Sequence, residues 1–125
     1  MSTDVTMTVD ADGVALITLD GADDLNLFAG ATGRALGAAL RTCDEDDAVR
    51  VVVLTGAGSA FCAGADLGAG SGAFDEPGAA FSASPVDPPA WQVRKLVIAA
   101  INGHAIGIGL TIALQCDLRL VAEDA

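Results

Sequence analysis

Two short apolar runs at the start of the chain have the pattern of a β-hairpin. Apolar and polar residues alternate over residues 5–9, and residues 14–19 form a second strand-like run. Asp12-Gly13 between them is a strong turn signal, because glycine readily adopts the positive φ that tight hairpin turns need. We therefore expect residues 5–9 and 14–19 to pair as antiparallel strands.

Helical spacing of apolar residues begins after this hairpin. Residues 27–43 carry apolar side chains three or four positions apart, which predicts an amphipathic helix. We expect Asp23 or Asp24 to cap its start. A second helix is predicted over residues 106–116, and a short one over residues 91–95.

Three further apolar runs predict strands. Residues 49–55 are β-branched and continuous, the pattern of a buried parallel strand. Residues 96–102 and 118–121 predict two more. Strands that alternate with helices indicate an α/β architecture, and 125 residues make up one domain or part of one.

The apolar stretch over residues 96–114 also has the length of a transmembrane helix, with Arg94-Lys95 on one flank. However, Asn102-Gly103-His104 stands in its middle, where polar groups are costly in lipid and natural in a turn. We therefore favour a strand, a turn and a helix, and expect no membrane partner.

Two segments lack periodicity. Residues 68–90 are rich in Gly, Ala, Ser and Pro, and a patternless segment of this length inside a domain is typical of a lid or a flexible loop. We expect a flexible loop there. The acidic run at residues 44–47 is expected to be a solvated loop rather than a metal site.

The charge balance excludes one class of partner. Six Lys and Arg against 17 Asp and Glu residues give a net charge of −11, whereas a nucleic-acid surface needs cations that neutralise phosphates. The three cysteines have no CxxC or Cys/His spacing, so we expect no metal site and a reducing, cytoplasmic location. The N-terminal residues have no pattern of a secretory signal.

Two glycine-rich segments carry the candidate chemistry. Residues 61–67 and 102–110 each follow a strand-like run and contain residues small enough for a ligand to reach the backbone. The N–H of Ile108, in the first turn of the predicted helix, would lack a helical acceptor, and the N–H of Ala65 is a second candidate donor. Two such donors facing one carbonyl oxygen would stabilise an oxyanion. Simple packing also explains these glycines, whereas the GxGxxG and GxxxxGK[ST] phosphate-binding patterns are absent.

The same segments resemble the two signatures of the crotonase (enoyl-CoA hydratase/isomerase) superfamily. The matching positions are, in order, Leu25-Asn26, residues 49–56, 60–67 and 97–105, Gly107, Gly109, and residues 114–119. The two signatures stand in the right order and at the right separation, and the resemblance covers nearly the whole chain except residues 68–90.

The resemblance implies an α/β fold, a crotonase-like spiral of ββα units. Residues 1–125 would be the N-terminal part of a single domain, without the C-terminal trimerisation helices. It further implies an acyl-CoA substrate, no cofactor beyond that coenzyme A thioester, and a homotrimer or hexamer at full length. The implied activity is that of an enoyl-CoA hydratase or isomerase of fatty acid metabolism. The alternatives are a non-catalytic acyl-CoA-binding protein and an inactive truncated fragment.

By position, the resemblance assigns the oxyanion donors to the backbone N–H groups of Ala65 and Ile108. Substrate and coenzyme A binding falls to backbone and small side chains of the same two segments, at Ala63, Gly64, Asp66, Leu67, Gly107 and Gly109. Asp66 would equally well cap or brace its loop.

Thr111 stands where the hydratases of this superfamily carry a glutamate. A threonine hydroxyl cannot act as a general base near neutral pH. It either orients a water or the substrate, or bonds back to a carbonyl one helical turn earlier. One-base chemistry such as isomerisation is therefore favoured over hydration. The resemblance places the other catalytic carboxylate beyond Ala125.

Weaker candidates complete the set. For His104, the single histidine, we favour an orienting or packing role over substrate binding. Cys62 has no basic partner to lower its pKa, so we do not expect it to be a nucleophile. Phe74, Phe81 and Trp91 either line an acyl pocket or anchor the long loop.

Overall fold

The computed structural model describes residues 3–67 and 82–125. Its elements follow in the order β1 (Asp4–Val9), β2 (Val14–Asp20), the 3-10 turn η1 (Ala22–Asp24), α1 (Gly30–Glu45), β3 (Val51–Gly56), β4 (Ala60–Cys62), the 3-10 turn η3 (Ala90–Gln92), β5 (Leu96–Ile101), β6 (His104–Ala105), α2 (Ile108–Gln115) and β7 (Leu118–Val121).

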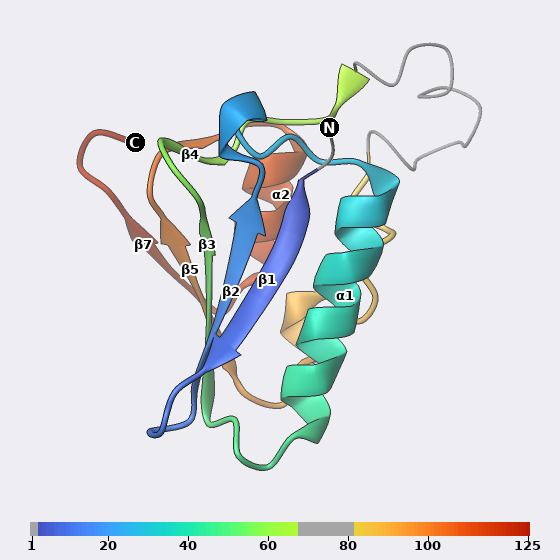
Figure 1. Cartoon of the computed structure of the whole chain (residues 1–125), viewed down its shortest axis with the longest axis vertical. Helices are drawn as coiled ribbons and strands as arrows, with labels where there is room; N and C mark the ends of the chain where they lie inside the picture. Colours follow the sequence, from blue (N-terminus) through green and yellow to red (C-terminus); the bar gives the residue numbers. More distant parts are fainter. Residues whose placement is uncertain (1–2, 68–81) are drawn as a thin grey trace.

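Within these stretches, a five-stranded sheet with the order β1-β2-β3-β5-β7 forms the body of the fold. β1 pairs antiparallel with β2, and every later pair in the sheet is parallel. The predicted hairpin and the predicted parallel strand are thus confirmed. Figure 1 shows α1 running alongside β1 and β2.

One face of this sheet carries the core. The register places Ala15 beside Val52, and Val52 beside Val97, and all three are fully buried. The opposite face is more open, since Val51, Val53 and the other alternate residues of β3 are only half-buried. The continuous apolar pattern of this strand therefore reflects a parallel ladder with one fully covered face, not two.

α1 begins at Gly30, three residues later than predicted. Ala29 is extended, with φ −123° and ψ 168°, so the backbone enters the helical conformation only after it. Phe28 instead forms a β-bridge with Ala65. The expected cap is also wrong, because Asp23 and Asp24 belong to η1, and the residue before α1 is Ala29.

Contrary to the prediction, the acidic run at residues 44–47 is not a loop throughout, because its first two residues form the end of α1. Asp44 still belongs to α1, and it accepts from the Arg94 guanidinium at 3.2 Å. The pKa of Asp44 lies below its usual value, first because the Arg94 backbone N–H also donates to it. Among the described residues, no three His, Cys, Asp or Glu side chains are grouped as metal ligands.

The segment before β5 has little regular structure but packs on the core. Ala83, Val86 and Ala90 are buried with the core residues, and the predicted short helix is the single turn η3. Residues 68–81, which hold most of the predicted flexible loop, lie outside the described residues.

The apolar stretch at residues 96–114 is divided between β5, β6 and α2, as the turn residues in its middle predict. None of the helices in the described parts of the chain has the length and apolar character needed to span a bilayer.

Candidate functional site

The two glycine-rich segments meet through a short parallel pair, β4 with β6. The N–H of Ile106 donates to the carbonyl oxygen of Cys62 at 3.0 Å. A β-carbon built on Gly109 would lie 2.0 Å from that same oxygen, so the first turn of α2 rests directly on the backbone of Cys62. The structure thus brings the segments predicted at residues 61–67 and 102–110 side by side.

The loop after β4 is tied to the N-terminal part of the chain on one side. Phe28 donates to the carbonyl of Gly64 at 2.8 Å, and Asp66 donates to the carbonyl of Phe28 at 2.7 Å. Since successive peptide groups of extended backbone point in opposite directions, the N–H of Ala65 faces away from Phe28. No acceptor for this N–H exists among the described residues.

The start of α2 has a second such donor. Gly109 donates to Ile106 at 2.9 Å, and Thr111 donates to Gly107 at 3.1 Å, whereas the N–H of Ile108 has no acceptor within the described chain. This is the expected state of a peptide group in the first turn of a helix. Gly107 precedes the helix with φ 57° and ψ −119°, a conformation suited to glycine.

Asn26 supports the site, a role that its place in the Leu25-Asn26 match did not indicate. It is fully buried, and its amide nitrogen donates to the carbonyls of Ala57 and Ala60 at 2.9 Å each and to that of Phe61 at 3.3 Å. Its amide oxygen accepts from the N–H of Gly21 at 2.8 Å. This side chain therefore holds the backbone that leads into the Gly64 loop.

Asn102 supports the same backbone from the other segment. Its amide nitrogen donates to the carbonyls of Gly58 and Ala60 at 3.0 Å each, and its amide oxygen accepts from the N–H of Gly56 at 3.2 Å. The two asparagines converge on the carbonyl of Ala60, and their positions within apolar runs are the sequence signal that could have revealed them.

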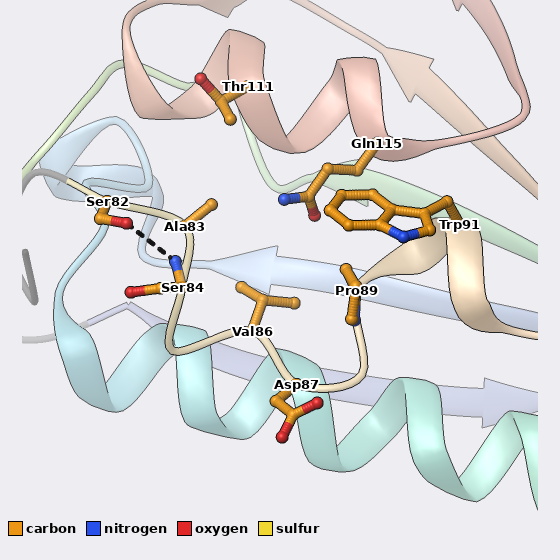
Figure 2. Close-up of a pocket in the computed structure, with 9 residues that line it drawn as sticks. All are labelled: Ser82, Ala83, Ser84, Val86, Asp87, Pro89, Trp91, Thr111 and Gln115. Carbon is orange, nitrogen blue, oxygen red and sulfur yellow. Dashed lines mark hydrogen bonds between the residues drawn. The ribbon is translucent and has the colours of Figure 1, made fainter.

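A cavity of about 400 Å³ lies between α2 and the segment before η3. Its described lining consists of Ser82, Ala83, Ser84, Val86, Asp87, Pro89, Trp91, Thr111 and Gln115. Asp87 is the only acid among these residues, and Figure 2 shows its carboxylate pointing away from α2. No carboxylate of the described lining therefore faces the space beside Thr111.

Thr111 lines this cavity, but its hydroxyl is engaged. Thr111 Oγ1 donates to the carbonyl of Gly107, one turn earlier, at 3.3 Å. Figure 2 shows the methyl carbon on the cavity side. The geometry matches the second of the two roles considered for this residue, a helix residue that bonds back to the preceding turn.

The remaining candidates fall in different places. Ala63 donates to the carbonyl of Leu25 at 3.1 Å, and Leu67 is 60% exposed. The His104 side chain is exposed, so it does not pack in the core. Trp91 lines the cavity, whereas Phe74 and Phe81 lie outside the described residues.

The environment of each cysteine disfavours its thiolate form. All three are free and buried. Burial raises the pKa of the Cys62 thiol, and the backbone hydrogen bond with Gly64 opposes this only in part. A neutral thiol is a poor nucleophile, in agreement with the expectation from sequence.

Comparisons with known proteins show the family of this chain. The sequence model of the Enoyl-CoA hydratase/isomerase family matches residues 10–125. The chain is 49% identical over 84 residues to the probable enoyl-CoA hydratase echA6 of Mycobacterium leprae. The aligned region covers 67% of this chain and 33% of that protein. Probable enoyl-CoA hydratase echA14 of Mycobacterium tuberculosis is 39% identical to this chain over 123 residues. That alignment covers 90% of this chain and 44% of the relative.

A solved structure shows the same fold. The crystal structure of a probable enoyl-CoA hydratase/isomerase from Mycobacterium abscessus has a TM-score of 0.88 and 51% identity, over 98% of this chain and 47% of that one. The chain thus spans about half of that structure and less than half of the two curated relatives. With a family match over residues 10–125, this chain belongs to the enoyl-CoA hydratase/isomerase family.

Proposed function

We propose that the backbone N–H groups of Ala65 and Ile108 together bind the thioester oxygen of an acyl-CoA. One observation carries this proposal: both N–H groups lack acceptors among the described residues, and they stand on segments joined by the Ile106–Cys62 hydrogen bond. Two donors aimed at one oxygen stabilise the negative charge that develops when a proton leaves the carbon beside a thioester.

Coenzyme A itself would be held by the same segments. Ala63, Asp66 and Leu67 follow β4, and we assign them to the adenine end of the ligand. Gly64 and Gly107 leave the backbone accessible beside the thioester. A ligand held largely by backbone suits a chain with a net charge of −11, because it requires few cationic side chains.

The whole protein would then act as an enoyl-CoA hydratase or isomerase. Related proteins named probable enoyl-CoA hydratases support this reaction class, as does a solved monofunctional enoyl-CoA isomerase from M. smegmatis with a TM-score of 0.79 and 34% identity. Since Thr111 supplies no carboxylate, one-base isomerisation is favoured over hydration. We also infer a homotrimer or hexamer, a cytoplasmic location and a role in fatty acid metabolism.

A second candidate is an acyl-CoA-binding protein that does not catalyse turnover. It is favoured by the absence of a carboxylate that faces the cavity from the described lining. In this case the oxyanion donors would serve binding only. Tight acyl-CoA binding without any turnover of enoyl-CoA substrates would identify this function.

The test replaces Ile108 by proline in the complete protein. Proline removes the N–H and is tolerated in the first turn of a helix. We expect kcat with an enoyl-CoA to fall by about 100- to 1000-fold, or acyl-CoA affinity to fall if the protein only binds. Ile108→Val is the matched control, since it keeps the N–H and trims the same buried side chain. Unchanged turnover and affinity in a folded Ile108→Pro protein would refute the assignment.

A further inference from the structure

α2 is apolar except at two positions, Thr111 and Gln115. Residues four apart lie on the same face of a helix, and both line the cavity. The Thr111 hydroxyl is paired with the Gly107 carbonyl. In contrast, the amide oxygen of Gln115 is buried and has no hydrogen-bond partner among the described residues.

A buried acceptor without a partner costs free energy, because it loses its hydrogen bonds to water and regains none. A leucine or methionine at this position would fill a similar volume without that cost. Figure 2 shows the Gln115 amide pointing from α2 toward the segment before η3. The amide is therefore placed to meet a group that enters the cavity.

The opposite wall does not supply this group. Ser82 Oγ accepts from the N–H of Ser84 at 3.0 Å, and the side chains of Val86 and Pro89 are apolar. Neither Gln115 nor Trp91 forms a side-chain hydrogen bond to another described residue. The cavity thus combines the apolar side chains of Ala83, Val86 and Pro89 with the Gln115 amide, whose buried oxygen has no partner among the described residues.

We propose that Gln115 selects an acyl-CoA whose acyl chain carries a hydroxyl group. This inference rests on the proposed function, since it takes the cavity to be the acyl site. A primary amide both donates and accepts hydrogen bonds, and so does a hydroxyl group. The hydroxyl of the ligand would therefore donate to the buried amide oxygen of Gln115. A carboxylate is disfavoured, because no cation belongs to the described lining and the chain is strongly acidic.

The position of Gln115 sets the place of the hydroxyl along the chain. Seven residues separate it from Ile108, a rise of about 10 Å along the helix, which is close to the length of an extended octanoyl chain. With the thioester oxygen at the Ile108 N–H, a terminal hydroxyl on an octanoyl chain would reach the Gln115 amide.

The test compares the binding of ω-hydroxyoctanoyl-CoA and octanoyl-CoA to the complete protein by calorimetry. We expect the wild type to bind the hydroxylated thioester about 10-fold more tightly. Gln115→Met, which keeps the length of the side chain, should reverse this preference. Leu114→Met, at a neighbouring exposed position of α2, should retain it.

Equal affinity of the wild type for the two thioesters would overturn the role of Gln115 while leaving the proposed function intact. A Gln115→Met protein that still prefers the hydroxylated thioester would overturn this role as well. If the wild type has no preference and Gln115→Met only unfolds the protein, Gln115 has a structural role instead. If the wild type binds neither thioester, both proposals fail. The wild-type preference itself decides the matter even if Gln115→Met does not fold.

Discussion

The carbonyl oxygen of Cys62 lies 2.0 Å from the point where a β-carbon on Gly109 would stand. No real side chain tolerates such a distance, so a glycine at position 109 is a condition of this packing. The contact seats the first turn of α2 on the end of β4. It thereby determines how closely the loop after β4, which holds Ala65, approaches the N–H of Ile108.

Replacing Gly109 by alanine should destabilise the protein. In an ordinary helix this change would stabilise by about 1 kcal/mol, but here the methyl group would have to displace the Cys62 backbone. We expect a net loss of about 1–3 kcal/mol in the free energy of unfolding, measured by urea denaturation. Thr111→Ala, on an exposed position of the same helix, is the control and should change stability by no more than about 0.5 kcal/mol. A Gly109→Ala protein as stable as the wild type would show that the contact is unimportant.

Asn26 should contribute to the stability of the protein through both its side chain and its backbone conformation. Asn26→Ala removes the amide that serves Gly21, Ala57 and Ala60 and puts alanine at a φ of 56°. We expect a loss of about 3 kcal/mol or more. Asn26→Gly separates the two effects, because it relieves the backbone strain but not the lost hydrogen bonds. If both variants unfold at the wild-type urea concentration, the network does not support the site.

Thr111→Glu should create hydration activity or increase it. The side chain lines the cavity, and a glutamate there could act as a general base toward water. We expect the rate of enoyl-CoA hydration by the complete protein to rise by about 100-fold, the lower end of what a positioned base contributes. Thr111→Gln has the same size without the basic group and should not gain activity. Equal rates in the two variants would mean that position 111 does not reach the reacting carbon.

Cys116 should make the protein less stable at alkaline pH. Burial raises the pKa of its thiol from 9.0 to about 12 in the folded state, and the charge of Asp117 adds to this. Between these two values the unfolded chain has lost the proton while the folded chain keeps it. The stability that is fully present below pH 9 is therefore lost as the pH rises toward 12.

The expected slope for this one group approaches 1.4 kcal/mol per pH unit. Urea unfolding between pH 8.5 and 10.5 measures it, and Cys116→Ala is the comparison because it removes the titrating group. Cys43 and Cys62 also have raised thiol pKa values, so the difference between the two proteins isolates Cys116. Identical slopes would mean that this thiol is not protected from ionisation.

Much of the fold follows from local patterns. The β1–β2 hairpin was predictable because Asp12-Gly13 and the flanking alternation act over neighbouring residues. The start of α1 was not, because Phe28 leaves the helical pattern to pair with Ala65, a partner 37 positions away along the chain. β4 and β6 were missed as strands because three and two residues are too few to show a period.

The sequence by itself determined the order of the longer helices and strands, the parallel core strand and the two segments that could offer free N–H groups, because periodicity and glycine content act within a few residues. Only the tertiary structure decided that the Cys62 carbonyl touches Gly109, that the Thr111 hydroxyl is occupied, and that Gln115 faces a cavity without a partner. These features depend on contacts between residues far apart in the chain. Such contacts arise when the sheet brings its strand ends together, and no local pattern records them.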